Sequence, residues 1–343
     1  ADQVRKLKIR ANADTPEDCE KALSFGAEGI GLCRTEHMFF EETRVHEFRK
    51  MILAAHKKSR TKHLKKLLPF QTKDFYNILK VMEGRPVTVR LLDPPLHEFI
   101  NIGDKELDHL ALDLKKTKAS IVSRIDFLKE SNPMLGHRGC RLGISYPEIT
   151  EMQAGAILGA ALKLKKEGGN PRVEIMIPLV SHINEFVNQK NIVLGVYKKL
   201  SQKSGLNLKY KIGTMIEVPR ACLVAEHIAK EADFFSFGTN DLTQTTFGFS
   251  RDDTSTFFES YFQENILSGD PFEQIDQNGV GKLMRIAVEG GRKTKRSLSI
   301  GICGEHGGEP NSIRFCSELG LNYVSCSPFR IPIARLAAAQ VEL

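Results

Sequence analysis

Several charged or reactive side chains directly follow short apolar runs, at the points where β-strands are expected to end. They are Arg34, Arg90 with Asp93, Glu217, Asn240 with Asp241, and Cys303. Arginine forks suit carboxylate or phosphate groups, carboxylates suit a hard divalent cation, and a thiol can exchange a proton. A set of this composition predicts one site for a small anionic substrate.

Glu217 ends the apolar run TMIEV, where a buried carboxylate is costly unless a positive group meets it. One interpretation is a structural ion pair with Arg220 or with an arginine at the strand ends. The other pairs Glu217 with Asp241, because two carboxylates with open positions are how proteins often hold Mg²⁺. The segment Gly238–Thr239–Asn240 can bring backbone N–H groups close to an anion.

Cys303 lies in the glycine-rich stretch SIGICGEHGG (299–308), followed by Glu305 and His306. Most cysteines in reduced proteins are small buried apolar residues, and a nucleophilic pair with His306 is a second interpretation. We favour a third, in which the thiol exchanges a proton at carbon, because its ordinary pKa of about 8.5 is close to working pH. The seven cysteines form no C-x-x-C pair, which argues against structural zinc or a disulfide framework.

Eight short β-branched runs alternate with helical segments and predict parallel strands joined by crossovers. The runs are 8–12, 29–34, 87–93, 173–179, 212–218, 234–239, 298–303 and 323–326, and the clearest helical segments are 16–26, 149–168 and 280–295. This pattern predicts an α/β fold, a closed (β/α)₈ (TIM) barrel, in which the strand ends named above meet at one mouth. An open doubly wound sheet is the alternative, but no glycine-rich dinucleotide turn follows the first run.

Two stretches exceed the minimal barrel, a charged helical segment at 40–83 and a mixed segment at 94–172 that includes NPMLGHRGCR. Both follow strands, so we expect helical insertions over the C-terminal rim, and Arg138 could join the site from the second. The net charge of +7 owes much to HKKSRTKHLKK (56–66), which is typical of a solvated helix face rather than of a nucleic-acid groove. No apolar run reaches membrane-spanning length and the N-terminus lacks a secretory leader pattern, so we expect a cytoplasmic protein with no membrane or nucleic-acid partner.

Long motifs in the chain resemble the C-terminal phosphoenolpyruvate/pyruvate-binding barrel of the phosphoenolpyruvate-utilising enzymes. They match the pyruvate, phosphate dikinases more closely than phosphoenolpyruvate synthase or the first enzyme of the bacterial sugar phosphotransferase system. The resemblance covers essentially residues 1–343, as a single domain. The motifs are 29–40, 87–99, 132–143, 213–221, 236–253, 301–310 and 323–340.

The resemblance implies a Mg²⁺-dependent transfer of a phosphoryl group between a phosphohistidine and pyruvate, forming or consuming phosphoenolpyruvate. It implies that Glu217 and Asp241 hold Mg²⁺ and that Arg34 and Arg90 neutralise the phosphoryl group and the enolate oxygen. It further implies that Cys303 exchanges the proton at the methyl carbon. Residues that bind the substrate carboxylate or support the site would be Gly238, Thr239, Asn240, Asp93, Arg138, Ser236 and Tyr323.

The family also implies partners outside this sequence. Its carrier histidine lies in a Gly-Gly-x-Thr-Ser-His-type segment that none of the ten histidines here matches, and no nucleotide-binding domain is recognisable. We therefore expect a separate C-terminal domain that lacks the ATP half-reaction and needs a phosphohistidine carrier domain. A homodimer through the barrel is expected, and a plastid or other organelle would be possible if a missing segment carried a transit peptide.

Other functions stay open on the sequence alone. The transfer could be that of a phosphoenolpyruvate synthase-like enzyme. A carbon–carbon lyase on the same pyruvate-binding barrel would leave Cys303 without an obvious task. A non-enzymatic module that binds phosphoenolpyruvate and dimerises is a third possibility, but it would not need all of these site residues.

Overall fold

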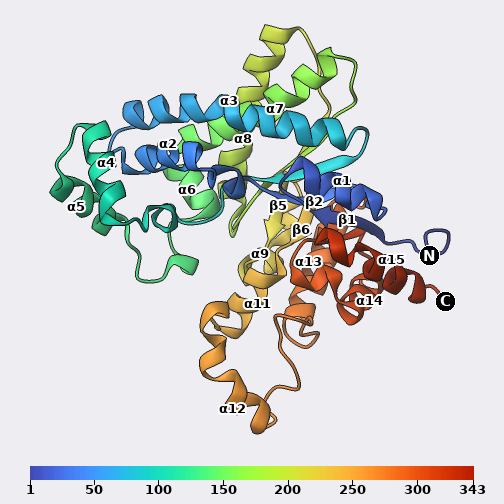
Figure 1. The fold of residues 1–343 in the computed structure, drawn as a ribbon. Coiled ribbons are helices and arrows are strands. Elements are labelled where there is room, and N and C mark those ends of the chain that lie inside the picture. The colour runs from blue at the N-terminus through green and yellow to red at the C-terminus, as the bar shows by residue number, and fades with distance from the viewer.

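The computed structural model of the chain describes residues 1–343, apart from the side chains of residues 42 and 43, and contains a closed barrel of eight parallel strands (Figure 1). Each strand pairs with the next along the chain, and β1 pairs with β8 to close the barrel. The strands are β1 Lys8–Asn12, β2 Ile30–Arg34, β3 Pro86–Arg90, β4 Arg172–Ile177, β5 Tyr210–Ile216, β6 Phe234–Phe237, β7 Ser299–Ile302 and β8 Tyr323–Cys326. The predicted barrel and all eight predicted strands are confirmed.

The strands are buried almost throughout, as expected of a parallel sheet that is covered by helices on its outer side and filled by side chains within. The barrel interior near the N-terminal ends of the strands is polar. Arg10 Nη1 donates to Glu174 Oε2 at 2.7 Å, and Thr88 Oγ1 donates to the same oxygen at 2.8 Å. The Arg10 guanidinium also lies 3.9 Å from the centre of the Tyr323 ring. This cluster closes the barrel floor.

The helices that return the chain between strands begin and end at recognisable signals. The side chain of Thr15 accepts a hydrogen bond from Asp18 N and Pro16 takes the first helical position, so α1 starts where the sequence predicts. The helices around the barrel are α1 Pro16–Ser24, α3 Lys57–Val81, α7 Pro147–Lys166, α8 Ile183–Ser204, α9 Pro219–Leu223, α10 Ala225–Ile228, α11 Thr239–Phe247, α13 Val280–Thr294, α14 Pro310–Glu318 and α15 Ile331–Gln340.

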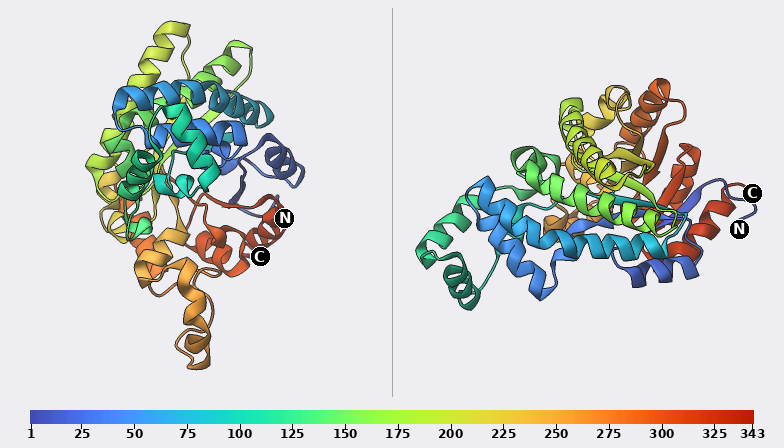
Figure 2. Two further views of the ribbon diagram at one scale, coloured as in Figure 1. Left: turned by 60° about the vertical axis from the view of Figure 1, so that its left-hand side comes forward. Right: turned by 90° about the horizontal axis from the view of Figure 1, so that it is seen from above.

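Helical insertions lie at the end of the molecule away from the two termini (Figures 1 and 2). They include α2 Glu42–Leu53, α4 Asp104–Leu114, α5 Lys118–Leu128 and α6 Gly139–Ser145. They have hydrophobic clusters of their own, one of which gathers Phe39, Phe48 and Phe99. The predicted insertions over the C-terminal rim are therefore present.

The prediction that residues 40–83 form one insertion is only half right, because α3 belongs to two parts of the molecule. Leu64 and Leu67 pack in the insertion cluster, whereas Phe75 and Ile78 pack in the barrel core. Pro69 lies inside the helix between these two pairs. The second half of α3 is thus the barrel's own helix between β2 and β3.

A third excursion follows β6 and was not predicted from the sequence. After α11, the chain runs out through α12 Phe258–Gln263 and returns to α13, and α12 projects from the body at the bottom of Figure 1. Aromatic rings hold this arm together, with Phe249 within 5.1 Å of Phe257 and 6.0 Å of Tyr261 between ring centres. No helix among the described residues has both the length and the apolar character needed to cross a membrane.

Candidate active site

Most of the predicted site residues lie at the C-terminal ends of the barrel strands, where parallel strands converge on one mouth. Tyr323 is an exception, because it is the first residue of β8. Arg34 and Arg90 are the last residues of β2 and β3, and these two positions are partners in the ladder. The others follow their strands directly, with Glu217 after β5, Gly238 after β6 and Cys303 after β7. Strand ends thus supply two guanidinium groups, a carboxylate, a glycine turn and a thiol.

Arg34 is held by Asp14, a residue that the sequence analysis missed. Asp14 Oδ2 accepts from Arg34 Nε at 3.1 Å and Nη2 at 2.9 Å, while Oδ1 accepts from the Arg34 backbone N–H at 2.6 Å. His37 Nδ1 lies 2.8 Å from the same Oδ2. Although burial opposes it, the hydrogen bond from His37 and the charge of Arg34 lower the pKa of Asp14. The Arg34 side chain remains 37% exposed, which leaves part of its fork open to a ligand.

Arg90 and Arg138 share the carboxylate of Asp93. Asp93 Oδ2 lies 3.0 Å from Arg90 Nη1 and 2.6 Å from Arg138 Nη2. Arg90 also pairs with the buried Glu36, which sequence reasoning missed. Burial opposes ionisation of Asp93, but the two arginines lower its pKa, so it stays charged. Asp93 and Arg138, predicted as supporting residues, therefore lie at the mouth and orient Arg90.

Arg138 links this group to Asp241. Its Nη1 donates to Asp241 Oδ1 at 3.0 Å, and its Nη2 lies 3.5 Å from Asp241 Oδ2. The long loop that follows β3 therefore reaches across to the first turn of α11. The sequence predicted only that Arg138, in the segment NPMLGHRGCR, could join the site. It did not predict that Arg138 would bridge the carboxylates of Asp93 and Asp241.

Glu217 is fully buried and only half satisfied. Its Oε1 accepts from the Leu179 backbone N–H at 2.5 Å, whereas Oε2 has no hydrogen-bond partner among the described residues. Leu179 has φ of 59°, a left-handed conformation that is uncommon outside glycine and asparagine. Burial, together with the charges of Asp241 and Asp93, raises the pKa of Glu217 well above its ordinary value. Arg220 instead donates to Ser181 O, so the structural ion pair with Arg220 is wrong.

A divalent cation fits this donor set. Glu217 Oε2 is buried and has no hydrogen-bond partner among the described residues, so a cation could bind to it. Asp241 can contribute a second carboxylate, because it is close enough to raise the pKa of Glu217. A β-carbon at Gly238 would lie 2.8 Å from that oxygen, so glycine keeps the space beside it open. No group of three or more His, Cys, Asp or Glu side chains suited to a metal occurs in the described part of the chain. Two carboxylates with open positions fit Mg²⁺ better than a closed structural site.

Cys303 is buried at the mouth beside hydroxyl groups. Its Sγ lies 3.7 Å from Phe237 O, and Asn12 Nδ2 donates to its backbone oxygen at 3.1 Å. Burial raises the pKa of Cys303 to about 11, so the thiol is protonated near neutral pH. Ser236 Oγ and Tyr323 Oη, both predicted as supporting groups, are buried without a hydrogen-bond partner among the described side chains. All seven cysteines are free and buried.

The turn after Cys303 holds the neighbouring loop through His306, which lies in a 3-10 turn at Glu305–Gly308. His306 Nε2 donates to Pro271 O at 2.9 Å, so Nδ1 accepts from Thr239 Oγ1 at 2.7 Å. Burial lowers the pKa of His306, which keeps the ring neutral. Glu305 N donates to Asn240 Oδ1 at 3.3 Å. His306 therefore positions Thr239 and does not contact Cys303 as a catalytic base would.

Replacing Gly304 by alanine tests this tight packing. A β-carbon there would overlap Thr239 Oγ1 and lie 3.1 Å from Thr239 N, so we expect a loss of about 1–3 kcal/mol in the free energy of unfolding. Gly159→Ala is the matched control, since it lies in α7 with no atom within 4 Å of the new carbon. It should stabilise the chain by about 0.5–1 kcal/mol. Urea unfolding measures both, and equal stability of the two variants would contradict the close approach.

Comparisons with known proteins identify the family of the chain. The family model described as "PEP-utilising enzyme, PEP-binding domain" matches residues 1–343. Curated relatives include pyruvate, phosphate dikinases from Clostridium symbiosum, 55% identical over 100% of this chain and 39% of the relative, and from Rhizobium meliloti, 57% identical over 100% and 38%. A chloroplastic pyruvate, phosphate dikinase from Mesembryanthemum crystallinum is 57% identical over 99% of this chain and 36% of the relative.

The chain spans under two fifths of the length of these curated relatives. A solved citrate lyase structure from Burkholderia xenovorans covers 84% of this chain and 75% of its own at 12% identity and a TM-score of 0.41, which is too distant to support an argument. The family model over the whole chain and the identities above 50% carry the assignment. The chain belongs to the phosphoenolpyruvate-utilising enzymes and corresponds to their phosphoenolpyruvate-binding domain.

Proposed function

We propose that the barrel mouth transfers a phosphoryl group between a phosphohistidine carrier domain and pyruvate, forming or consuming phosphoenolpyruvate, as a part of a pyruvate, phosphate dikinase. The observation that carries this proposal is that the charges of Arg90 and Arg138 act on a half-satisfied buried Glu217, and that Arg34 is the ladder partner of Arg90. Arginines and a cation-seeking carboxylate at one mouth suit a substrate with both phosphate and carboxylate groups. The names of the relatives agree with it.

Some of the site residues would neutralise charge on the substrate, and others would hold the substrate in position. Glu217 and Asp241 would hold Mg²⁺, which supplies a positive centre that polarises substrate oxygens when bound. The open part of the Arg34 fork and the Arg90 guanidinium, each oriented by carboxylates, would neutralise the phosphoryl group and the enolate oxygen. Backbone N–H groups of Thr239 and Asn240 would receive the substrate carboxylate, while Gly238, whose own N–H donates to Ile216 O at 3.1 Å, would let the substrate approach closely.

Cys303 would exchange the proton at the methyl carbon of the substrate. In the direction that consumes phosphoenolpyruvate, the thiol donates its proton to the enolate carbon and leaves a thiolate. In the opposite direction, the thiolate removes one methyl proton from pyruvate, and the enolate oxygen accepts the phosphoryl group from the carrier. Because the pKa of Cys303 is about 11, the donor form dominates at neutral pH.

The experiment that tests the proposal adds a phosphorylated carrier domain in trans. The chain should form phosphoenolpyruvate from pyruvate in the presence of Mg²⁺, and ATP alone should give no product. Phosphorus NMR follows the phosphoryl group. Tight binding of phosphoenolpyruvate without any transfer would instead favour the non-enzymatic module. Condensation of pyruvate with an aldehyde or thioester would favour the lyase. The homodimer and the cytoplasmic or plastid location stay predictions, the first of which sedimentation analysis can check.

A further inference from the structure

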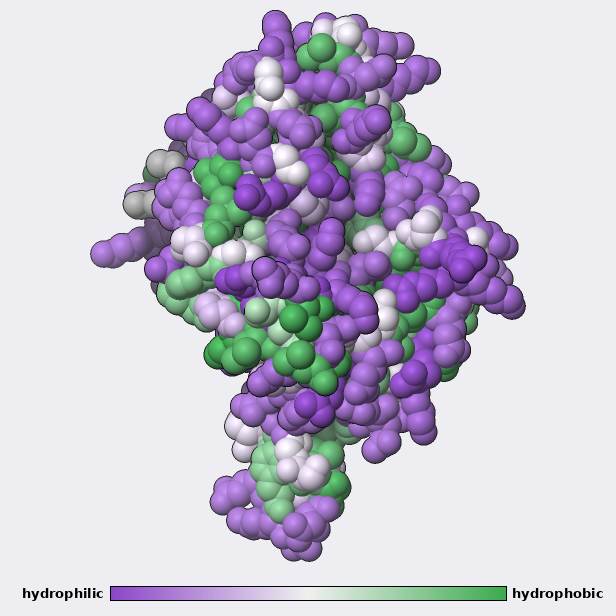
Figure 3. Space-filling view, turned by 90° about the vertical axis from the view of Figure 1, so that its right-hand side faces the viewer, coloured by the Kyte–Doolittle hydropathy of each residue, from purple (hydrophilic) through white to green (hydrophobic). Residues whose placement is uncertain are grey.

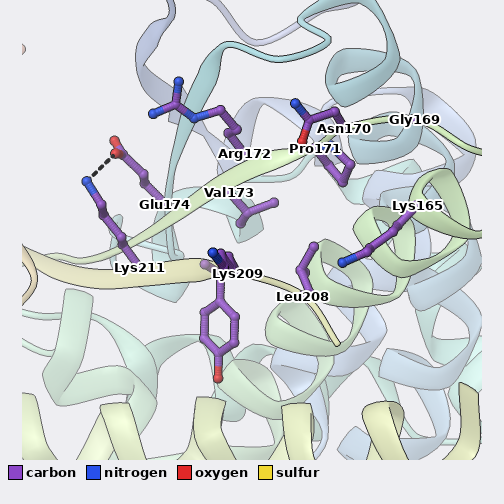
Figure 4. A pocket seen from close by; sticks show the side chains of 11 residues that line it. Lys165, Gly169, Asn170, Pro171, Arg172, Val173, Glu174, Leu208, Lys209 and Lys211 are labelled. Atoms are coloured by element: carbon purple, nitrogen blue, oxygen red, sulfur yellow. Dashed lines mark ion pairs between the residues drawn. The ribbon is translucent and has the colours of Figure 1, made fainter. Parts of the chain in front are cut away.

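The end of the barrel opposite the candidate active site contains two adjoining cavities, of about 690 and 530 Å³. Arg172, Glu174 and Lys211 line both of them, so we treat the two as one basal cavity. Figure 4 shows the part around the first residues of β4 and β5, and Figure 3 views the end of the molecule where the termini lie, which is hydrophilic over its centre.

The basal cavity has a large excess of positive charge. Seven cationic side chains line it, against the two carboxylates of Glu174 and Glu342. The cations are Lys6, Lys8, Arg10, Lys165, Arg172, Lys209 and Lys211. The cavity therefore has five more cationic than anionic side chains.

The two carboxylates already have partners. Glu174 accepts from Arg10 at 2.7 Å and lies 3.5 Å from Lys211 Nζ, and Glu342 pairs with Lys6. Among the described residues, no carboxylate pairs with the remaining four cations, Lys8, Lys165, Arg172 and Lys209. Lys165 donates to the backbone oxygen of Asn207, and Arg172 makes only a 3.4 Å contact with Gly84 O. The cavity thus retains four positive groups without a counter-charge.

A structural explanation accounts for only one of the four. In this fold the helices end near the starts of the strands, and lysines in a last helical turn offset the negative end of the helix dipole. Lys165 lies in the last turn of α7 and fits that explanation. Lys8 and Arg172 are the first residues of β1 and β4, and Lys209 directly precedes β5, so none of them belongs to a helix end.

We propose that the basal cavity binds a small anion carrying two or more phosphate groups. The cations come from α7, β1, β4 and the segment before β5, and a concave surface focuses their field on one compact occupant. Taken separately, the two parts of the basal cavity, of about 690 and 530 Å³, each lie within the range of about 300–1,000 Å³ that is typical of small-molecule sites. The site does not depend on the proposed function, because it lies at the opposite end of the strands from the mouth.

The test is a calorimetric titration of the 343-residue chain with inorganic tripolyphosphate in the absence of divalent cations. The double variant Arg172→Ala, Lys209→Ala should lower the affinity about tenfold or more and flatten its dependence on salt. Two matched controls distinguish the site. The double variant Lys57→Ala, Lys58→Ala removes two exposed charges from the start of α3, and Arg34→Ala removes a cation at the mouth. Both should bind tripolyphosphate as the unaltered chain does.

Each other outcome contradicts the proposal. Equal loss in the α3 control would show only attraction by net charge, and loss in Arg34→Ala would place the anion in the candidate active site. Absence of tripolyphosphate binding would refute the proposal outright. Tighter binding of a short DNA duplex than of tripolyphosphate would replace the small anion by a nucleic acid. Thermal unfolding confirms that each variant is folded before its titration is interpreted.

Discussion

Glu217→Gln is expected to lower the Mg²⁺-dependent affinity for phosphoenolpyruvate about 100-fold or more, at or beyond the upper end of losses seen when groups around a metal are altered. The glutamine retains an oxygen that can accept from Leu179 N–H but removes the charge that a cation would meet. Calorimetric titration with and without Mg²⁺ measures the effect. Equal affinities with and without the metal, in both proteins, would refute the metal role of Glu217.

The same variant should be more stable at high pH, relative to the unaltered chain. Because the pKa of Glu217 is raised in the fold, the folded chain binds the proton more tightly than the unfolded chain does. The unaltered chain therefore loses stability as the pH rises above the ordinary pKa of the carboxyl group, near 4.5, and the glutamine variant escapes this loss. Thermal unfolding between pH 5 and pH 8 should show a difference that grows with pH and shrinks when Mg²⁺ is added.

A matched control is Glu148→Gln. Glu148 is also buried with one unpartnered oxygen, but it pairs with Arg60 at 2.7 Å in the insertion region. We expect this variant to lose stability, because the buried Arg60 is left without its counter-charge. It should nevertheless bind phosphoenolpyruvate with Mg²⁺ normally. Loss of binding in both variants would mean that the effect is a general one of removing buried carboxylates.

Cys303→Ala is expected to reduce the exchange of pyruvate methyl protons with deuterated solvent by about 100- to 10,000-fold, the range of a positioned acid or base. Proton NMR of pyruvate with the chain and Mg²⁺ measures the rate. In the unaltered chain the rate should rise with pH between 7 and 9, because the pKa of Cys303 is about 11 and the thiolate that removes the proton is still the minor form there. Binding of phosphoenolpyruvate should change little.

Cys326→Ala provides the control for that substitution. Cys326 is also a buried thiol, at the end of β8, but it has no place in the proposed chemistry. Its exchange rate should equal that of the unaltered chain. If Cys303→Ala also exchanges at the full rate, another group at the mouth performs the proton transfer, and the proposed role of Cys303 is wrong.

Strands and strand-end residues were predictable from the sequence, and the partners of those residues were not. A short apolar run predicts a buried strand, and the charged residue that follows it, such as Arg34, Arg90 or Glu217, predicts where the strand ends. Asp14 and Glu36 lie only two residues beyond strand ends, so the same reasoning could have found them, but nothing in their spacing says which arginine they hold. Arg138 reaches Asp241 through a loop whose path depends on tertiary packing.

The two remaining differences have similar causes. Residues 57–81 read as one charged helix, and their apolar positions do not say that one half faces the insertion and the other half faces the barrel. In the arm around α12 the pairs Phe257–Tyr261 and Phe258–Phe262 have the i,i+4 spacing of a helix, but that local spacing does not show that the helix projects from the barrel. Local sequence patterns therefore predicted the type and extent of each element, but not which other elements it packs against.

Because one half of α3 packs in the insertion and the other half packs in the barrel core, this helix connects the rim to the barrel wall. A continuous helix of 25 residues extends about 37 Å, so a displacement of the insertion is carried along the first half of α3 toward the barrel. Pro69 cannot donate to the carbonyl one turn earlier, and it lies between the half anchored in the insertion and the half anchored in the barrel. We therefore expect a tilt of the insertion over the mouth to bend α3 at Pro69 and to leave its barrel half in place.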